Sequence, residues 1–78
     1  MSHTVRVVCE ATEIDENITV SEDALVLDLL IHAGVNDVTK LLTYRFVYYQ
    51  HTRPIVATVL QPVTSVPEGE TLFVRERD

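Results

Sequence analysis

The sequence predicts an α+β domain of two layers, in which one main helix packs on one face of a mixed sheet of four to five strands. Three observations predict it. Runs of β-branched and aromatic residues, typical of strands, occur on both sides of one segment with helical spacing. A length of 78 residues fits one small domain, residues 1–78, and a content of 46% hydrophobic residues separates it from disordered chains. Since a single helix cannot bury its own apolar side, it must lie against the sheet.

The first two strands are predicted to form a hairpin. Residues 4–10 are β-branched and partly alternate in polarity, so we expect them to form a strand. Residues 11–16 are acidic and contain no apolar run, which indicates a turn, and residues 17–20 are expected to form a second, short strand. Two strands this close in sequence favour a hairpin.

The segment after this hairpin has the start and stop signals of a helix. Ser21 is a good N-cap residue, and Glu22 and Asp23 follow in the first turn, where the helix dipole favours negative charge. Gly34 is a natural terminator. Apolar residues recur between these signals at helical spacing, at Leu25, Val26, Leu29 and Leu30. Together they predict a helix of about 12 residues.

The strongest strand signal follows a segment of uncertain structure. Residues 35–42 suit either a loop or another short helix. Residues 43–49 contain three tyrosines and a phenylalanine in seven positions, which favours a strand. Residues 50–54 are expected to turn the chain, because they include a proline at their end.

The last segments complete the predicted sheet. Residues 55–60 are expected to form a strand that is short or lies at an edge, and residues 61–66 a loop. Residues 67–70 contain a glycine in a turn-forming context. Residues 71–75 form a final alternating strand. Because the first and last strands are both strongly apolar, we expect both of them in the middle of the sheet.

This order of elements resembles the β-grasp of ubiquitin and its relatives over essentially the whole chain. Residues 66–74, Val-Pro-Glu-Gly-Glu-Thr-Leu-Phe-Val, are similar to the closing turn and strand of ubiquitin-like, ThiS/MoaD-like and TGS domains. Residues 44–48, Tyr-Arg-Phe-Val-Tyr, resemble the third strand of ubiquitin-like proteins. The resemblance implies a ubiquitin-like β-grasp fold. Ubiquitin and the sulfur carriers are activated through a C-terminal Gly-Gly, and this chain departs from that pattern with Arg-Glu-Arg-Asp at residues 75–78.

Charge and composition disfavour several classes of function. Twelve Asp and Glu against six Lys and Arg give a net charge of −6, which disfavours nucleic acids and membrane surfaces as main partners. One cysteine excludes an internal disulfide framework, and two glycines leave no Gly-rich phosphate loop. No apolar stretch approaches the roughly 20 residues of a membrane span. Because no signal peptide is recognised, a cytoplasmic location is expected.

The residues that could carry out chemistry are scattered rather than clustered. His3, His32 and His51 show no ligand spacing to one another or to Cys9, so no metal site is predicted. Cys9 is expected to be a small buried hydrophobe, with a reactive thiol as the alternative. The carboxylates of residues 10–28 are expected to form a solvated surface, with recognition of a basic partner as the alternative. The sequence therefore predicts no catalytic residue, no cofactor and no enzymatic activity.

The sheet offers one candidate surface for binding a partner. Alternation places Val8, Val47 and Phe73 outward on adjacent strands, with Arg6, Arg45 and Arg75 at the rim. An apolar centre with an arginine rim is typical of protein interfaces. A shift of one residue in strand register would invert this assignment. In ubiquitin-like proteins the same sheet face carries the apolar recognition patch, and the resemblance implies that role for Val47 and Phe73, with Arg45 and Arg75 next to them.

The helix offers a second candidate surface. Leu27 and Ile31 are four residues apart and fall on the side of the helix that faces away from the sheet. We expect them to bind a partner or a second copy of the chain. The alternative is that residues 35–42 fold over them.

The leading functional hypothesis is a non-enzymatic ubiquitin-like protein–protein interaction module that docks its exposed sheet face onto a protein partner. One alternative is a ubiquitin-like modifier or sulfur-carrier-type protein with an atypical or processed C-terminus. Another is a small accessory subunit of a larger enzyme complex. Self-association through exposed apolar residues is a further alternative.

Overall fold

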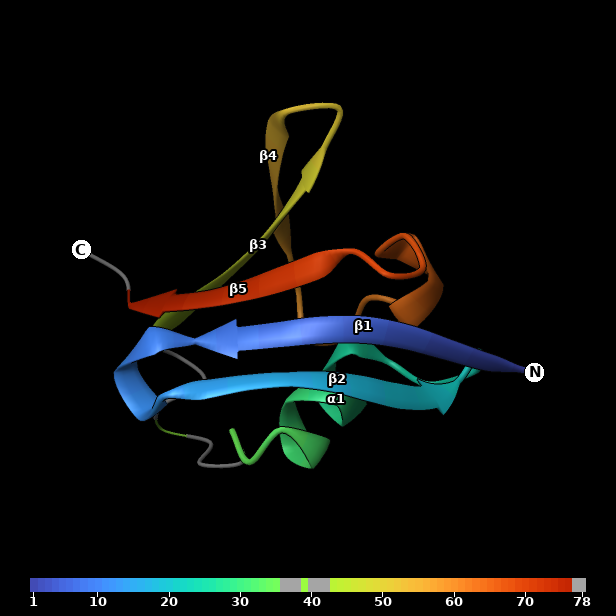
Figure 1. The fold of residues 1–78 in the computed structure, drawn as a ribbon, viewed down its shortest axis with the longest axis horizontal. Coiled ribbons are helices and arrows are strands. Elements are labelled where there is room, and N and C mark those ends of the chain that lie inside the picture. The colour runs from blue at the N-terminus through green and yellow to red at the C-terminus, as the bar shows by residue number, and fades with distance from the viewer. Residues whose placement is uncertain (36–38, 40–42, 77–78) are drawn as a thin grey trace.

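The protein has a five-stranded sheet with a short helix on one face (Figure 1). The structure is a computed structural model, and it describes residues 1–35, 39 and 43–76. The strands are β1 (Ser2–Cys9), β2 (Ile14–Ser21), β3 (Tyr44–Gln50), β4 (Arg53–Ala57) and β5 (Thr71–Glu76). The helices are α1 (Val26–His32) and the short 3-10 turns η1 (Glu10–Thr12) and η2 (Val63–Ser65). The predicted α+β architecture of two layers is confirmed.

The sheet places the first and last strands side by side near its middle. The strand order is β2-β1-β5-β3-β4. β1 runs parallel to β5, whereas β1–β2, β3–β5 and β3–β4 are antiparallel. The prediction that the first and last strands both lie inside the sheet is therefore confirmed, and so is the first hairpin.

One apolar core lies between the sheet and α1. Along β1, strict alternation turns Val5, Val7 and Cys9 toward the helix, and all three are fully buried. Full burial of a valine side chain such as Val5 or Val7 stabilises the fold by roughly 1.5–3 kcal/mol. The helix contributes Val26, Leu29 and Leu30, and β5 contributes Leu72 and Val74. Burial of Cys9, which forms no disulfide, confirms its predicted place in the core.

The second strand is longer than predicted, and Ser21 is not a helix cap. β2 has eight residues, because β1 pairs with it from Cys9↔Ile14 to Ser2↔Ser21. The predicted turn over residues 11–16 is therefore wrong in its second half. Pairing with β1 holds the backbone of Ser21 in the sheet. This pairing outweighs the local preference of serine for capping a helix.

The helix is accordingly shorter than the predicted one. α1 has seven residues, and the backbone N–H of Leu25 just before it donates to the Asp28 carboxylate at 2.9 Å. Gly34 ends the helix as predicted, with a φ of 94°. The backbone N–H groups of Gly34 and Val35 donate to the Ile31 and Leu30 carbonyls at 3.0 and 2.8 Å. In the described part of the chain, no helix has the length and apolar character needed to cross a membrane. The short helix predicted within residues 35–42 falls mostly outside the described residues.

The β3–β4 hairpin turns earlier than predicted. Gln50 pairs with Arg53, which leaves His51 and Thr52 as a two-residue loop, and β4 ends at Ala57 rather than at residue 60. Both loop residues have positive φ, 51° and 68°. Positive φ at both central residues defines a type I′ turn, which normally uses Asn-Gly.

A buried histidine near the N-terminus ties β1 to the segment before β5. No structural role was predicted for His3, yet this residue is only 7% exposed. Its Nε2 donates to the Val66 carbonyl oxygen at 2.6 Å, and its Nδ1 lies 3.1 Å from a carboxylate oxygen of Glu68. These contacts join residues more than sixty positions apart, so no local pattern could have indicated them.

Replacing His3 with alanine should lower the free energy of unfolding by about 1–3 kcal/mol, because it leaves a buried carbonyl without its donor. Urea denaturation would measure the change. His32→Ala is the matched control, since His32 is exposed and its loss should change stability by no more than about 0.5 kcal/mol. Equal effects of the two substitutions would contradict a structural role for His3.

Thr52→Gly should raise the free energy of unfolding by about 1 kcal/mol, because an L-residue in the left-handed region is strained and glycine is not. Thermal or urea unfolding would show the gain. The control is Thr64→Gly in η2, where φ is not positive and glycine should destabilise instead. A loss of stability in both variants would contradict strain at the turn.

Candidate functional site

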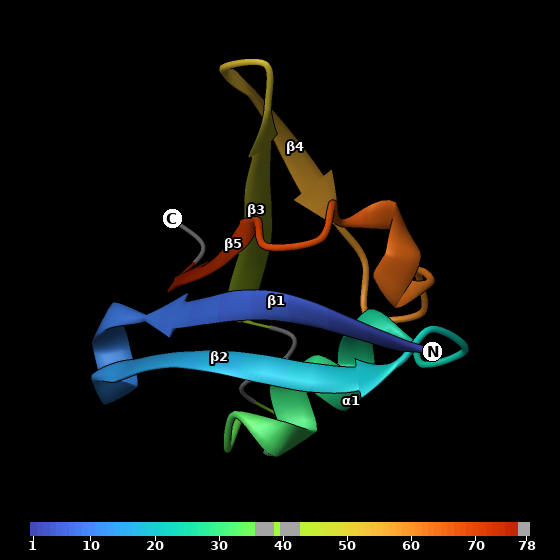
Figure 2. The same ribbon diagram turned by 45° about the vertical axis from the view of Figure 1, so that its right-hand side comes forward.

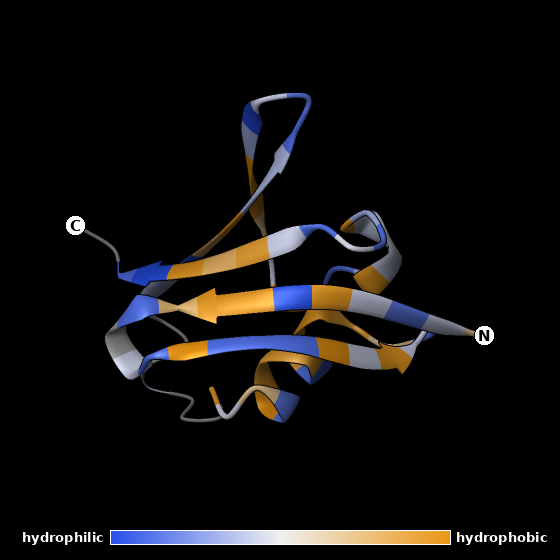
Figure 3. Ribbon diagram, in the orientation of Figure 1, coloured by the Kyte–Doolittle hydropathy of each residue, from blue (hydrophilic) through white to orange (hydrophobic). Residues whose placement is uncertain are grey.

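A row of apolar side chains crosses the face of the sheet that points away from α1. The register pairs Val8 with Phe73, Phe73 with Val47, and Val47 with Val56, so these residues occupy neighbouring positions on four strands. Tyr49 lies two residues beyond Val47 on the same face. We call these five residues the outer patch. The predicted outward placement of Val8, Val47 and Phe73 on adjacent strands is confirmed by this register, and Figure 3 shows hydrophobic stretches of β1 and β5 side by side.

Exposure within the outer patch differs from the prediction. Val47 is only 7% exposed, because it lies in the middle of the row between Phe73 and Val56. Val8 and Phe73 are half-buried. The most accessible members are Val56, at 60%, and Tyr49, at 36%. Val47 is therefore covered by its neighbours in the outer patch and offers little surface to a partner.

Val56 and Tyr49 are the members of the outer patch that were not predicted as binding residues, although alternation along the strand turns Tyr49 to the same face as Val47. A two-residue turn at His51 and Thr52 places Val56 opposite Val47. Only the exact length of this turn would have identified Val56 as a member of the patch from the sequence. With the turn predicted over residues 50–54, the facing pair could not be identified.

Two ring contacts hold Phe73 in place. The Tyr49 ring meets it edge to face, with centroids 5.9 Å apart and planes at 78°. The Arg75 guanidinium carbon lies 5.1 Å from the Phe73 ring centroid, within the range of a cation–π contact. The Phe73 side chain is therefore oriented before any partner arrives.

The arginines at the edge of the outer patch lack a carboxylate partner among the described residues. Arg45 and Arg75 are directly opposed across β3 and β5, and both are exposed. Like charges in this position repel each other. Neither forms an ion pair with a described residue, whereas Arg6 on β1 binds Asp15 through two hydrogen bonds of 2.7 and 2.6 Å. The patch is thus flanked by local positive charge on a chain whose net charge is −6.

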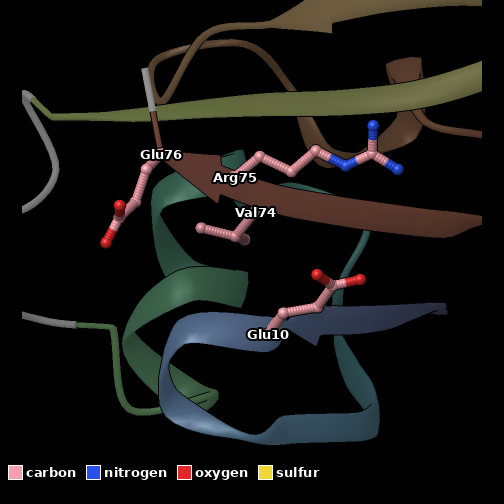
Figure 4. A pocket seen from close by; sticks show the side chains of 4 residues that line it. All are labelled: Glu10, Val74, Arg75 and Glu76. Carbon is pink, nitrogen blue, oxygen red and sulfur yellow. The ribbon is translucent and has the colours of Figure 1, made fainter. Parts of the chain in front are cut away.

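A shallow depression of about 460 Å³ adjoins Arg75 at the end of the sheet (Figure 4). It is lined by Glu10, Val74, Arg75 and Glu76. In Figure 4 the Arg75 guanidinium and the Glu76 carboxylate point to opposite sides. This end of the sheet therefore has mixed charge, unlike the middle of the outer patch.

The second predicted surface, on the helix, is only partly accessible. Ile31 is 47% exposed, as expected for the side away from the sheet. Leu27 is half-buried, because its backbone N–H donates to the Val59 carbonyl at 2.9 Å and brings the 58–61 turn beside it. Leu27 is therefore less accessible than Ile31, and binding of a partner by these two residues stays a prediction. Leu60, at 71%, is an exposed apolar residue of that turn that the sequence did not single out.

Among the described residues, the Arg6–Asp15 pair on the outer face of the sheet shifts the ionisation of both of its members. The hydrogen bond from Arg6, followed by its charge, lowers the pKa of Asp15 below its ordinary value. The same hydrogen bond raises the pKa of Arg6. Both groups are exposed, so solvent screens the interaction.

Comparison with known proteins identifies the fold. No family model matches this chain, and no curated protein matches it by sequence. Among solved structures, it is similar to the UBL domain of yeast Ddi1, with a TM-score of 0.60 and 16% identity over 99% of this chain and 91% of that one. It is also similar to the C-terminal ubiquitin-like domain of mouse tubulin-specific chaperone e, with a TM-score of 0.65 and 20% identity over 100% and 89% of the two chains. The fold is therefore a ubiquitin-like β-grasp, as the sequence predicted.

Asp15→Asn should lower stability at neutral pH but not in acid. Because the folded-state pKa of Asp15 is lowered, its contribution is present above the unfolded value of about 3.9 and is lost as the pH falls through the folded value. Urea unfolding of both proteins from about pH 2.5 to pH 7 should show a difference that disappears at the acid end. High salt should shrink it at neutral pH. A difference that persists in acid would contradict this origin.

Proposed function

We propose that this chain is a non-enzymatic protein–protein interaction module, a single ubiquitin-like domain over residues 1–78 that binds a protein partner through the outer patch. The observation that carries the proposal is the apolar row across four strands, flanked by two arginines without a carboxylate partner in the described structure. The ubiquitin-like fold of the solved neighbours supports a binding role. The buried cysteine, which forms no disulfide, fits a cytoplasmic setting.

The apolar part of the patch would supply most of the binding energy. Aromatic side chains at the centre of an interface commonly dominate affinity. Phe73 is already oriented by Tyr49 and Arg75, so little side-chain entropy is lost when a partner covers it. Val56, the most exposed member, lies on β4 and would extend the contact area onto that strand.

The arginines would select the partner's charge. Arg45 and Arg75 repel each other across the strand pair, and a partner carboxylate between them would relieve this repulsion. Exposed charges at the rim of an interface act mainly on association rate and specificity. We therefore expect an acidic rim around an apolar anchor on the partner.

A role as accessory subunit of a larger complex is the second candidate. Ile31 and Leu60 expose apolar surface outside the outer patch, and a larger assembly would cover both. Size-exclusion and co-purification from the source organism distinguish the two, because a free module purifies alone and exchanges its partners.

Phe73→Ala should weaken partner binding about tenfold or more, because it removes the oriented aromatic anchor. Val56→Ser should weaken it by a smaller factor, and charge reversal of Arg45 or Arg75 should weaken it modestly with a marked salt dependence. Partners captured by the wild-type protein would be identified by mass spectrometry and then titrated in purified form against each variant.

Leu60→Ser is the matched control for this series, since it removes an exposed apolar side chain away from the patch. It should leave those affinities unchanged. Val47→Ala is a poor probe, because Val47 is buried and its truncation would cost stability. Unchanged affinities in folded Phe73→Ala and Val56→Ser would refute the proposal.

A further inference from the structure

The β3–β4 hairpin projects from the body of the sheet and carries a second concave surface. Figures 1 and 2 show the two strands extending beyond the other three, and the hairpin closes at Gln50↔Arg53. A depression of about 560 Å³ lies at this end. It is lined by Gln50, His51, Arg53, Pro54 and Ile55.

The floor of this depression lies on the other face of the sheet from the outer patch, whereas Pro54, which pairs with Tyr49, lies on the outer-patch face. Tyr48 and Ile55 are paired, and both pack with the core on the helix side of the sheet. By alternation, Gln50 and Arg53 lie on that same side, two pairs farther toward the tip. The half-buried Ile55 forms an apolar floor, and the exposed polar side chains form the rim.

The rim supplies hydrogen-bond donors and no carboxylate. Gln50 has an amide, His51 an imidazole and Arg53 a guanidinium, whose planar fork matches a carboxylate. The sequence has no Asp or Glu from residue 43 to residue 67. Neither His51 nor Arg53 forms an ion pair with any described residue. An anionic group would therefore meet cationic and neutral donors only.

The backbone conformation at the tip of the hairpin lowers the stability of the fold. His51 and Thr52 both hold positive φ, and Thr52 is β-branched, which makes this conformation unfavourable. Asn-Gly would form the same turn with less strain. Strained backbone of this kind persists most often where it positions functional side chains, and here it places His51 within the turn and Arg53 directly after it.

We infer that the tip of the β3–β4 hairpin is a second binding subsite, which takes a carboxylate-rich peptide segment of a protein partner. The half-buried Ile55 suits the methylene groups of a glutamate side chain, and Arg53 and His51 suit its carboxylate. Because Ile55 and Arg53 lie on the other face of the sheet from the outer patch, the two binding proposals can be tested separately.

Blocked hexaglutamate is the probe, followed by ¹H–¹⁵N NMR of the whole chain at low salt. We expect saturable shifts of the amides of residues 50–55, which hexaglutamine does not produce. Arg53→Gln should weaken this binding about three- to fivefold, the range of an exposed ion pair. The matched control is Arg6→Gln, which makes the same charge change on β1 and should keep the wild-type affinity.

A double variant, His51→Asn with Thr52→Gly, separates binding from folding. It keeps a type I′ turn and should be more stable than the wild type, yet bind hexaglutamate more weakly. Phe73→Ala should leave the shifts at residues 50–55 unchanged, so failure of the outer patch and failure of this subsite give different results.

Four results would overturn the inference. They are the absence of saturable shifts at residues 50–55, an equal loss of affinity in Arg6→Gln, an unchanged affinity in the double variant, and equal saturation by inorganic phosphate at the same charge concentration. The last would show a site for small free anions rather than for a peptide.

Discussion

The parallel pairing of β1 with β5 is the contact on which the other strands depend. It runs from Arg6↔Thr71 to Cys9↔Val74 and joins segments more than sixty residues apart. β2 is attached to the sheet only through β1, and β3 and β4 only through β5. The pairing also sets Val8 against Phe73, so the outer patch exists only in this register. A slip by one residue would turn its side chains into the core and the core residues into solvent.

The segment before β5 fixes that register. The Gly69 N–H donates to the Thr4 carbonyl at 2.8 Å, and the Arg6 N–H donates to the Glu70 carbonyl at 3.0 Å. Gly69 has a φ of 78°, which a glycine adopts without strain. His3 adds a buried side-chain bond to Val66 one step earlier along β1. Backbone and side-chain contacts thus specify the same alignment, and the core packs on it.

Local sequence patterns correctly predicted the features that neighbouring residues determine, such as the two faces of a strand and the end of a helix. Alternation identified the inward and outward faces of β1 and β5, and a glycine correctly marked the end of α1. The errors arose where distant contacts compete with local preference. Ser21 has the residue type of a helix cap but is held by β1, and His3 is buried by a segment far along the chain. Exposure of Val47 depended on its two cross-strand neighbours, which no single strand reveals.

The two edges of the sheet bear on which surfaces can bind. β2 exposes Asp15 and Glu16 along one edge strand, and β4 has Arg53 and Pro54 in the other. Charged residues and proline at an edge discourage pairing with a strand of another chain, because they add repulsion or remove a backbone donor. Partners are thereby directed to the faces of the sheet. On those faces the β3–β4 hairpin combines exposed apolar side chains with a stretch free of carboxylates, so the acidic half of the chain need not determine what it binds.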